Sequence, residues 1–126
     1  MGVLIGIFYI IAAAYAGLPN LDSDNEVIIK TSSSIFVEIA SNPTTGYSWF
    51  FLEPKVNAIS VKNLAGVYNP PPPGSPVGES GKQVFELVCN TSCNLGDIFY
   101  LTLVKKRPWE DTSVETRTVR VRVSNE

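Results

Sequence analysis

From residue 18 onward, apolar and polar residues alternate with a period of two, and turn residues separate the alternating runs. This is the pattern of β-strands that bury one face, whereas an amphipathic helix repeats its apolar positions every three to four residues. We find no helical period of useful length in this region. The runs predict seven short strands, at residues 27–30, 35–40, 48–52, 59–64, 83–89, 98–105 and 116–123.

Two of these runs carry finer expectations. Residues 98–105 are apolar on both faces, which predicts a deeply buried strand. The aromatic and apolar run 48–52 predicts a central strand. Seven to eight short strands joined by turns are typical of an all-β, immunoglobulin-like β-sandwich, and we expect that fold here.

Residues 1–16 differ from the rest of the chain because they contain no charged residue. Residues 3–14 form an apolar run of 12, shorter than the about 20 residues that a spanning helix needs. The run ends in Ala14-Tyr15-Ala16, which matches the small-residue pattern before a signal-peptidase cut. We predict a signal peptide over 1–16 and one mature domain over 17–126, with an uncleaved anchor or a buried strand as alternatives. The chain would then be secreted or sent to a lysosome- or phagosome-like vesicle.

Composition narrows the function classes. A length of 126 residues indicates one domain. A net charge of -2 without a basic patch argues against nucleic-acid binding. The chain has no histidine, which removes Ser-His-Asp and Cys-His catalysis. A carboxylate pair among Glu110, Asp111 and Glu115 is conceivable, but their polar loop favours a solvated surface. We expect a monomer that is not an enzyme and that binds no cofactor, no metal and, after signal cleavage, no membrane.

The two cysteines, Cys89 and Cys93, lie four positions apart. In an oxidising compartment an even count suggests a disulfide, and two free thiols are the alternative. Without histidine, two cysteines do not complete a usual zinc site. Between them, Asn90-Thr91-Ser92 is an Asn-x-Ser sequon, so Asn90 is a candidate for N-glycosylation on a surface loop.

Three connections are longer or more unusual than strand linkage requires: residues 42–47, 68–81 and 107–113. In the first, Pro43 restricts the backbone and Gly46 permits a positive φ. Thr44 and Thr45 form a small, uncharged tip that can enter a narrow cleft without a large desolvation cost. The plain alternative is an ordinary Pro-Gly hairpin turn.

The other two connections offer different kinds of contact. Residues 78–81 are glycine-rich after a stiff run of four prolines, and they either make main-chain contacts or are simply mobile. In the third, Trp109 is either an exposed binding residue or folded back onto the core. Arg107 can stack on the ring of Trp109 or pair with Glu110.

Together these motifs resemble the signature loops of the chagasin family, which inhibits papain-like cysteine peptidases. The motifs are Asn-Pro-Thr-Thr-Gly-Tyr-Ser-Trp at 42–49, Gly-Glu-Ser-Gly at 78–81 with Phe85 downstream, and Arg-Pro-Trp at 107–109. The resemblance extends from about Asn25 to Ser124. The family favours Gly-x-Gly-Gly in the middle motif, where this chain has Ser80 in the third place after its proline run.

The resemblance implies tight, reversible, non-covalent inhibition by three loops lying side by side at one end of the sandwich. The first loop would enter the active-site cleft, the middle loop would make main-chain contacts beside it, and the indole of the third would pack on aromatic surface. An immunoglobulin-like secreted adhesion or ligand-binding module is the alternative. The protease-binding residues implied are Asn42, Pro43, Thr44, Thr45, Gly46, Tyr47, Gly78, Glu79, Ser80, Gly81, Arg107, Pro108 and Trp109.

Overall fold

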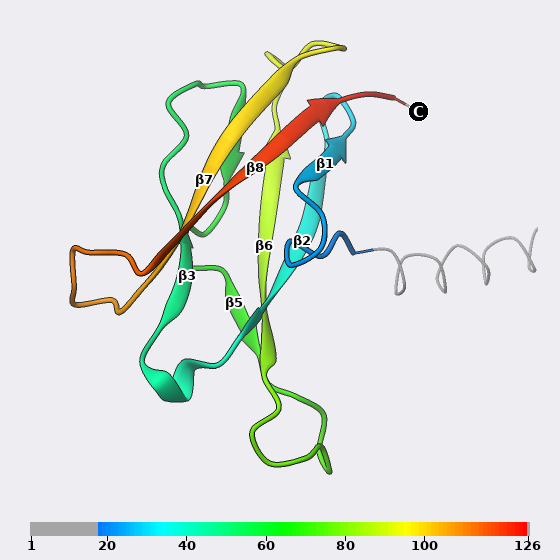
Figure 1. The fold of residues 1–126 in the computed structure, drawn as a ribbon. Coiled ribbons are helices and arrows are strands. Elements are labelled where there is room, and N and C mark those ends of the chain that lie inside the picture. The colour runs from blue at the N-terminus through cyan, green and yellow to red at the C-terminus, as the bar shows by residue number, and fades with distance from the viewer. Residues whose placement is uncertain (1–17, 126) are drawn as a thin grey trace, which may run out of the picture.

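The computed structural model describes residues 18–125, so the predicted signal peptide and its cleavage point lie outside the described residues. Two mainly antiparallel sheets face each other in a sandwich (Figure 1), which confirms the all-β prediction. One sheet has the order β1-β8-β7-β3, and the other has β2-β6-β4 with β5 also paired to β6. The strands are β1 (Glu26–Ile29), β2 (Ser34–Ser41), β3 (Ser48–Phe51), β4 (Ile59–Val61), β5 (Val67–Asn69), β6 (Gly81–Cys89), β7 (Ile98–Lys106) and β8 (Glu115–Val123).

The inner faces of the two sheets form the core, and the alternation seen in the sequence sets which residues face it. Phe51 of β3 meets Phe85 of β6 edge to face, with ring centroids 4.9 Å apart, so this pair joins the sheets. Such a pair adds about 0.5–1.5 kcal/mol beyond the burial of its area. The fully buried residues around it include Val37, Ile39, Leu87, Leu103 and Val121.

Two strand expectations were wrong in detail. β7 is not buried on both faces, because Ile98 and Tyr100 are 40% and 66% exposed while Leu101 and Leu103 are buried. No second layer covers the outer face of this sheet in residues 18–125, so its apolar residues remain open to solvent. β3 is an edge strand rather than a central one. β5 was missed, since its three residues are all exposed and give no alternation of burial.

The segment before β1 covers one edge of the other sheet. The Leu21 N–H donates to the Glu38 carbonyl at 2.8 Å, and the Glu38 N–H donates to the Pro19 carbonyl at 3.0 Å. The Asp22 carboxylate accepts from the Ala40 N–H at 2.8 Å. These bonds satisfy backbone groups on the open side of β2, which would otherwise be a site for pairing with another chain. Within the described residues no helix is long and apolar enough to cross a membrane.

Strand register determines where the three long connections meet. In the antiparallel pair β2–β6, Ser41 lies opposite Gly81, so the first loop begins beside the end of the middle loop. In the pair β3–β7, Ser48 lies opposite Lys106, so the first loop ends beside the start of the third. In Figure 1 the first and middle loops project from one end of the sandwich, while the third loop, between β7 and β8, extends to the side.

The cysteines lie at the other end. Gly81 and Cys89 are the first and last of the nine residues of β6, about 26 Å apart at the usual rise per residue. Cys89 and Cys93 are joined by a disulfide and are buried. Inside this small loop the Asn90 side chain accepts from the Ser92 N–H at 2.8 Å and donates to the Asn57 carbonyl.

Candidate functional site

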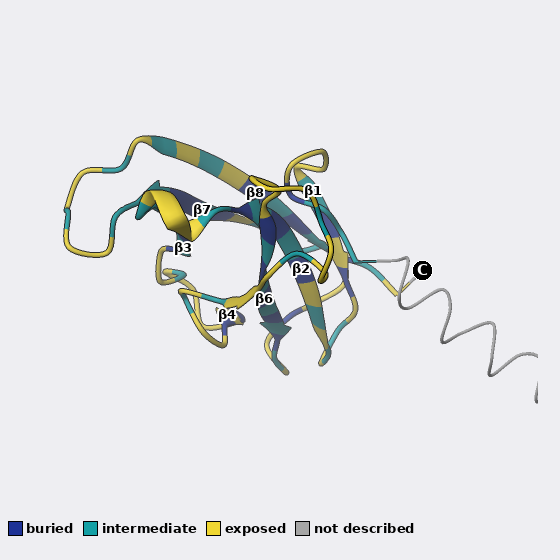
Figure 2. Cartoon of the chain, turned by 90° about the horizontal axis from the view of Figure 1, so that it is seen from below, coloured by how far each residue is buried: buried dark blue, intermediate teal, exposed yellow. Residues whose placement is uncertain are grey.

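The first loop is a 3₁₀ turn over Pro43–Thr45 that is closed by its own hydrogen bonds. The Asn42 side-chain oxygen accepts from the Thr44 hydroxyl at 2.6 Å, and the Thr45 hydroxyl donates to the Asn42 carbonyl at 2.9 Å. Gly46 has φ +86°, and its N–H donates to the Pro43 carbonyl at 2.9 Å. The tip is exposed (Figure 2), yet the hydroxyl groups of Thr44 and Thr45 are already bonded within the loop, so its shape is set before any partner arrives.

This loop is not a hairpin turn, because the strands on its two sides belong to different sheets. A hairpin would join neighbouring strands of one sheet, as the middle loop joins β5 to β6. The first loop instead crosses from β2 to β3 at the end of the sandwich. It therefore projects beyond both sheets.

The third loop presents Trp109 to solvent. Its indole is 73% exposed, so it does not fold back onto the core. A turn forms behind it, in which the Glu110 N–H donates to the Arg107 carbonyl at 3.0 Å and Lys106 Nζ donates to the Glu110 carbonyl at 2.9 Å. A Cβ placed on Gly46 would lie 3.4 Å from the Trp109 ring, so the first and third loops touch.

Arg107 joins these two loops by a contact that the sequence did not suggest. It pairs with Glu110 at 3.3 Å, one of its two predicted partners. Its guanidinium lies 4.5 Å from the ring centroid of Tyr47 rather than on Trp109. The indole face of Trp109 therefore stays available for a partner.

Three further cations, which the sequence analysis did not single out, lie over the aromatic residues that follow the first loop. Arg117 and Lys105 lie 4.9 Å and 5.8 Å from the Trp49 ring, and Lys106 lies 5.6 Å from the Phe50 ring. Each such contact contributes about 0.5–1 kcal/mol at an exposed site. The signal for the two lysines was the run of Lys105, Lys106 and Arg107, whose place beside β3 only the strand register reveals. Arg117 lies on β8, and no such run marks it.

The middle loop accommodates Ser80 in the place where the family motif Gly-x-Gly-Gly has a glycine. Gly78 has φ +88° and needs to be glycine, whereas Ser80 is not among the residues with positive φ, so its side chain adds no backbone strain. Ser80 shares a hollow of about 300 Å³ with Asn42 and Thr45. Gly81 is required for a different reason, because a Cβ there would lie 2.3 Å from the Asn69 carbonyl oxygen.

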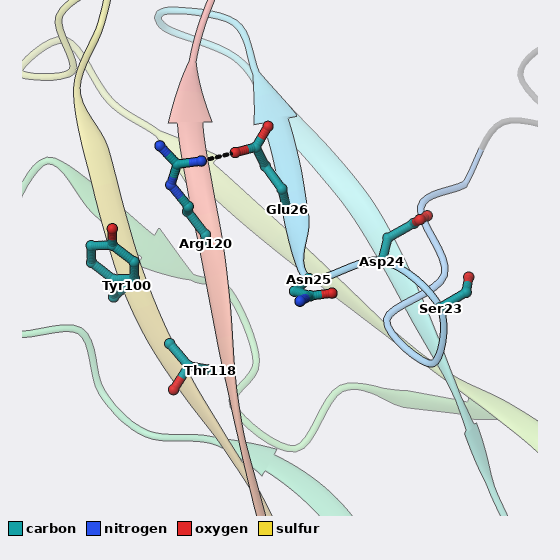
Figure 3. A pocket seen from close by; sticks show the side chains of 7 residues that line it. All are labelled: Ser23, Asp24, Asn25, Glu26, Tyr100, Thr118 and Arg120. Atoms are coloured by element: carbon teal, nitrogen blue, oxygen red, sulfur yellow. Dashed lines mark hydrogen bonds and ion pairs between the residues drawn. The ribbon is translucent and has the colours of Figure 1, made fainter.

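The predicted residues thus fall into groups. The structure brings Asn42–Tyr47 together with Ser80 and with Arg107–Trp109, while the tip residues Gly78 and Glu79 extend into solvent. No group of histidine, cysteine or carboxylate side chains within residues 18–125 is arranged to hold a metal. A separate shallow hollow of about 580 Å³ lies on the outer sheet face (Figure 3). Its Arg120 and Glu26 pair with each other, and no residue of the three loops lines it.

An immunoglobulin-like sandwich that carries three neighbouring loops presents a surface suited to binding. The model of the chagasin family of peptidase inhibitors (I42) matches residues 28–123, and the chain belongs to this family. The match confirms the resemblance to the chagasin family. At the level of the family, it also confirms the predictions that the chain is a protease inhibitor and not an enzyme. The family assignment also decides against the adhesion module.

Two solved structures, those of EhICP2 and amebosin, support the fold. A cysteine protease inhibitor, EhICP2, from Entamoeba histolytica matches with a TM-score of 0.58 at 19% identity, covering 85% of this chain and 93% of that one. Amebosin matches with a TM-score of 0.53 at 26% identity, covering 83% and 94%. PbICP-C, solved in complex with falcipain-2, matches with a TM-score of 0.48 at 16% identity, covering 86% and 90%. No curated protein matches the sequence.

Replacing Gly81 by alanine should destabilise the fold by about 1–3 kcal/mol, because the new methyl group meets the Asn69 carbonyl and the Tyr68 ring in a buried position. The neighbouring exposed change Ser80→Ala should stay within about 0.5 kcal/mol of the native chain. Urea unfolding of both variants measures the difference. Equal stabilities would contradict the tight approach of the two strands at the base of the middle loop.

Proposed function

We propose that the chain inhibits papain-like cysteine proteases by occluding the active-site cleft with its three loops, without covalent chemistry. The first loop is the wedge, with the exposed Thr44 and Thr45 at its tip facing the catalytic cysteine and histidine of the protease. The convergence of the first and third loops around Gly46 is the observation that carries this proposal.

The physical properties of the tip support a wedge. Residues 42–46 contain no charged side chain, so entering a narrow cleft requires no desolvation of an ion. Their hydrogen bonds are internal, so little conformational freedom is lost on binding. The tight turn also holds the tip away from the extended geometry of a substrate. We therefore expect the chain to survive the encounter uncut.

The flanking loops have separate roles in this proposal. The exposed Trp109 supplies the apolar anchor beside the cleft, while Arg107, held on Tyr47, keeps the third loop against the first. The middle loop, with Gly78, Glu79, Ser80 and Gly81, offers main-chain groups along the other side.

Titration of active papain with the purified chain tests the function directly. We expect tight inhibition that is reversed on dilution, with the inhibitor still a single intact band on a gel afterwards. A folded chain that leaves papain and several cathepsins active at micromolar concentration would disprove the proposal. Progressive cleavage of the chain would identify a substrate instead of an inhibitor.

The substitution Trp109→Ala should raise the inhibition constant about 5- to 150-fold, equivalent to about 1–3 kcal/mol, as expected for an exposed aromatic that becomes buried in an interface. Tyr100→Ala is the matched control, since Tyr100 is a similarly exposed aromatic on β7 outside the three loops. If both variants inhibit like the native chain, Trp109 is not part of the interface.

We also propose that the chain enters the secretory pathway, with residues 1–16 removed, and acts outside the cell or in a lysosome- or phagosome-like vesicle. The Cys89–Cys93 disulfide supports an oxidising compartment. Expression in a secreting eukaryotic cell should yield a chain that begins at Gly17, as read by mass spectrometry of its N-terminal peptide. Retention of Met1 on the mature protein would contradict cleavage. Mass spectrometry of the peptide that contains Asn90 reports whether this residue, at the end of the sandwich away from the loops, carries a glycan.

A further inference from the structure

Gln83 is a polar residue near the end of β6 from which the middle loop leaves, and it is only 4% exposed. Its side-chain oxygen accepts from the Trp49 N–H at 2.7 Å and from the Ser41 hydroxyl at 2.9 Å. Its side-chain nitrogen donates to the carbonyls of Trp49 and Ala65, both at 2.9 Å. Two accepted and two donated bonds saturate an amide group.

Three of these four bonds go to the two stems of the first loop, and the fourth goes to Ala65. Ser41 is the last residue of β2, and Trp49 is the second residue of β3. These strands belong to different sheets, so no strand ladder joins the two ends of the loop. The Gln83 amide supplies a direct link between them.

The bonds to Trp49 imitate a neighbouring strand. Gln83 both accepts from the backbone N–H of Trp49 and donates to its carbonyl, as a peptide group of an adjacent strand would. β3 is an edge strand, and this contact lies on the side away from β7. One side chain of the facing sheet therefore fixes the place at which the loop returns to its strand.

We propose that Gln83 is a positioning residue for inhibition: its amide fixes the separation of the two stems and so holds the wedge in its binding shape. It touches no protease, since it is buried beneath the loop. This proposal rests on the proposed role of the first loop as the wedge. Without the amide, the loop would sample other shapes, and only the fraction in the competent shape would bind.

Gln83→Met tests the proposal, because methionine keeps the length of the side chain and removes all four hydrogen bonds. We expect the folded variant to inhibit papain about tenfold more weakly or worse. Leu87→Ala is the matched control, a truncation on the same inward face of β6 far from the loop, where Leu87 is fully buried. It should lower the melting temperature and leave the inhibition constant of the folded protein unchanged.

Ser41→Ala is a milder variant for the case in which Gln83→Met does not fold. It removes one hydrogen bond and should weaken inhibition about 2- to 12-fold. In the double variant Ser41→Ala/Gln83→Met, inhibition should be no weaker than with Gln83→Met alone, because the partner of Ser41 is already gone. Purely additive losses would contradict a shared positioning role.

Hydrogen exchange separates this proposal from the proposed function. The Trp49 amide should exchange at least about tenfold faster in Gln83→Met, relative to the amide of the buried Leu103, since its acceptor is lost. Native inhibition constants in a folded Gln83→Met, or an equal loss in Leu87→Ala, would overturn the positioning role. If the native chain fails to inhibit, the proposed function is wrong. Independently of inhibition, unchanged exchange of the Trp49 amide in Gln83→Met would overturn the positioning role.

Discussion

The chain changes sheets between Ser41 and Ser48, and the other two loops take their places from this crossing. Because Ser41 is registered with Gly81 and Ser48 with Lys106, the crossing loop has one neighbour on each side. Neither neighbour is close in sequence. Cross-strand pairing, which is governed by burial of one face of each strand, thus assembles a surface by bringing together residues 40 and 58 positions apart in the chain.

A crossing between sheets lacks the ladder that supports a hairpin, and the structure compensates for this in two ways. Beneath the loop, the amide of Gln83 bonds both stems. Beside it, Arg107, Lys105 and Arg117 lie over the rings of Tyr47 and Trp49 as the chain re-enters the sheet. The loop itself adds internal bonds around Asn42. Rigidity is therefore distributed over backbone, buried amide and aromatic contacts, while the exposed tip stays small and uncharged.

The alternation of residues was sufficient to predict the fold. It located seven of the eight strands, because each of those strands has a buried face, and it missed β5, whose residues are all exposed. It did not distinguish a central from an edge strand, since the aromatic run at β3 is buried on one side whichever neighbour it has. The apolar outer residues Ile98 and Tyr100 suggested a second covering layer that residues 18–125 do not provide.

The loop motifs predicted which segments form the candidate site, but they did not predict the long-range contacts between these segments. Nothing local indicated that Arg107 would lie on Tyr47, 60 positions away in the chain. A signal for Gln83 did exist. It has the same parity as Phe85 and Leu87 in its strand, which places a polar amide on the buried face and implies that it has partners there.

β8 begins beside the third loop and ends at the opposite pole, where the Ser124 N–H donates to the Ile29 carbonyl at 2.9 Å. The described chain thus leaves the sandwich on the side away from the loops (Figure 1). A surface, a fluorophore or a second domain attached through this end would leave the loops facing outward. The geometry suits the molecule to use as an immobilised capture reagent, oriented by its own last strand.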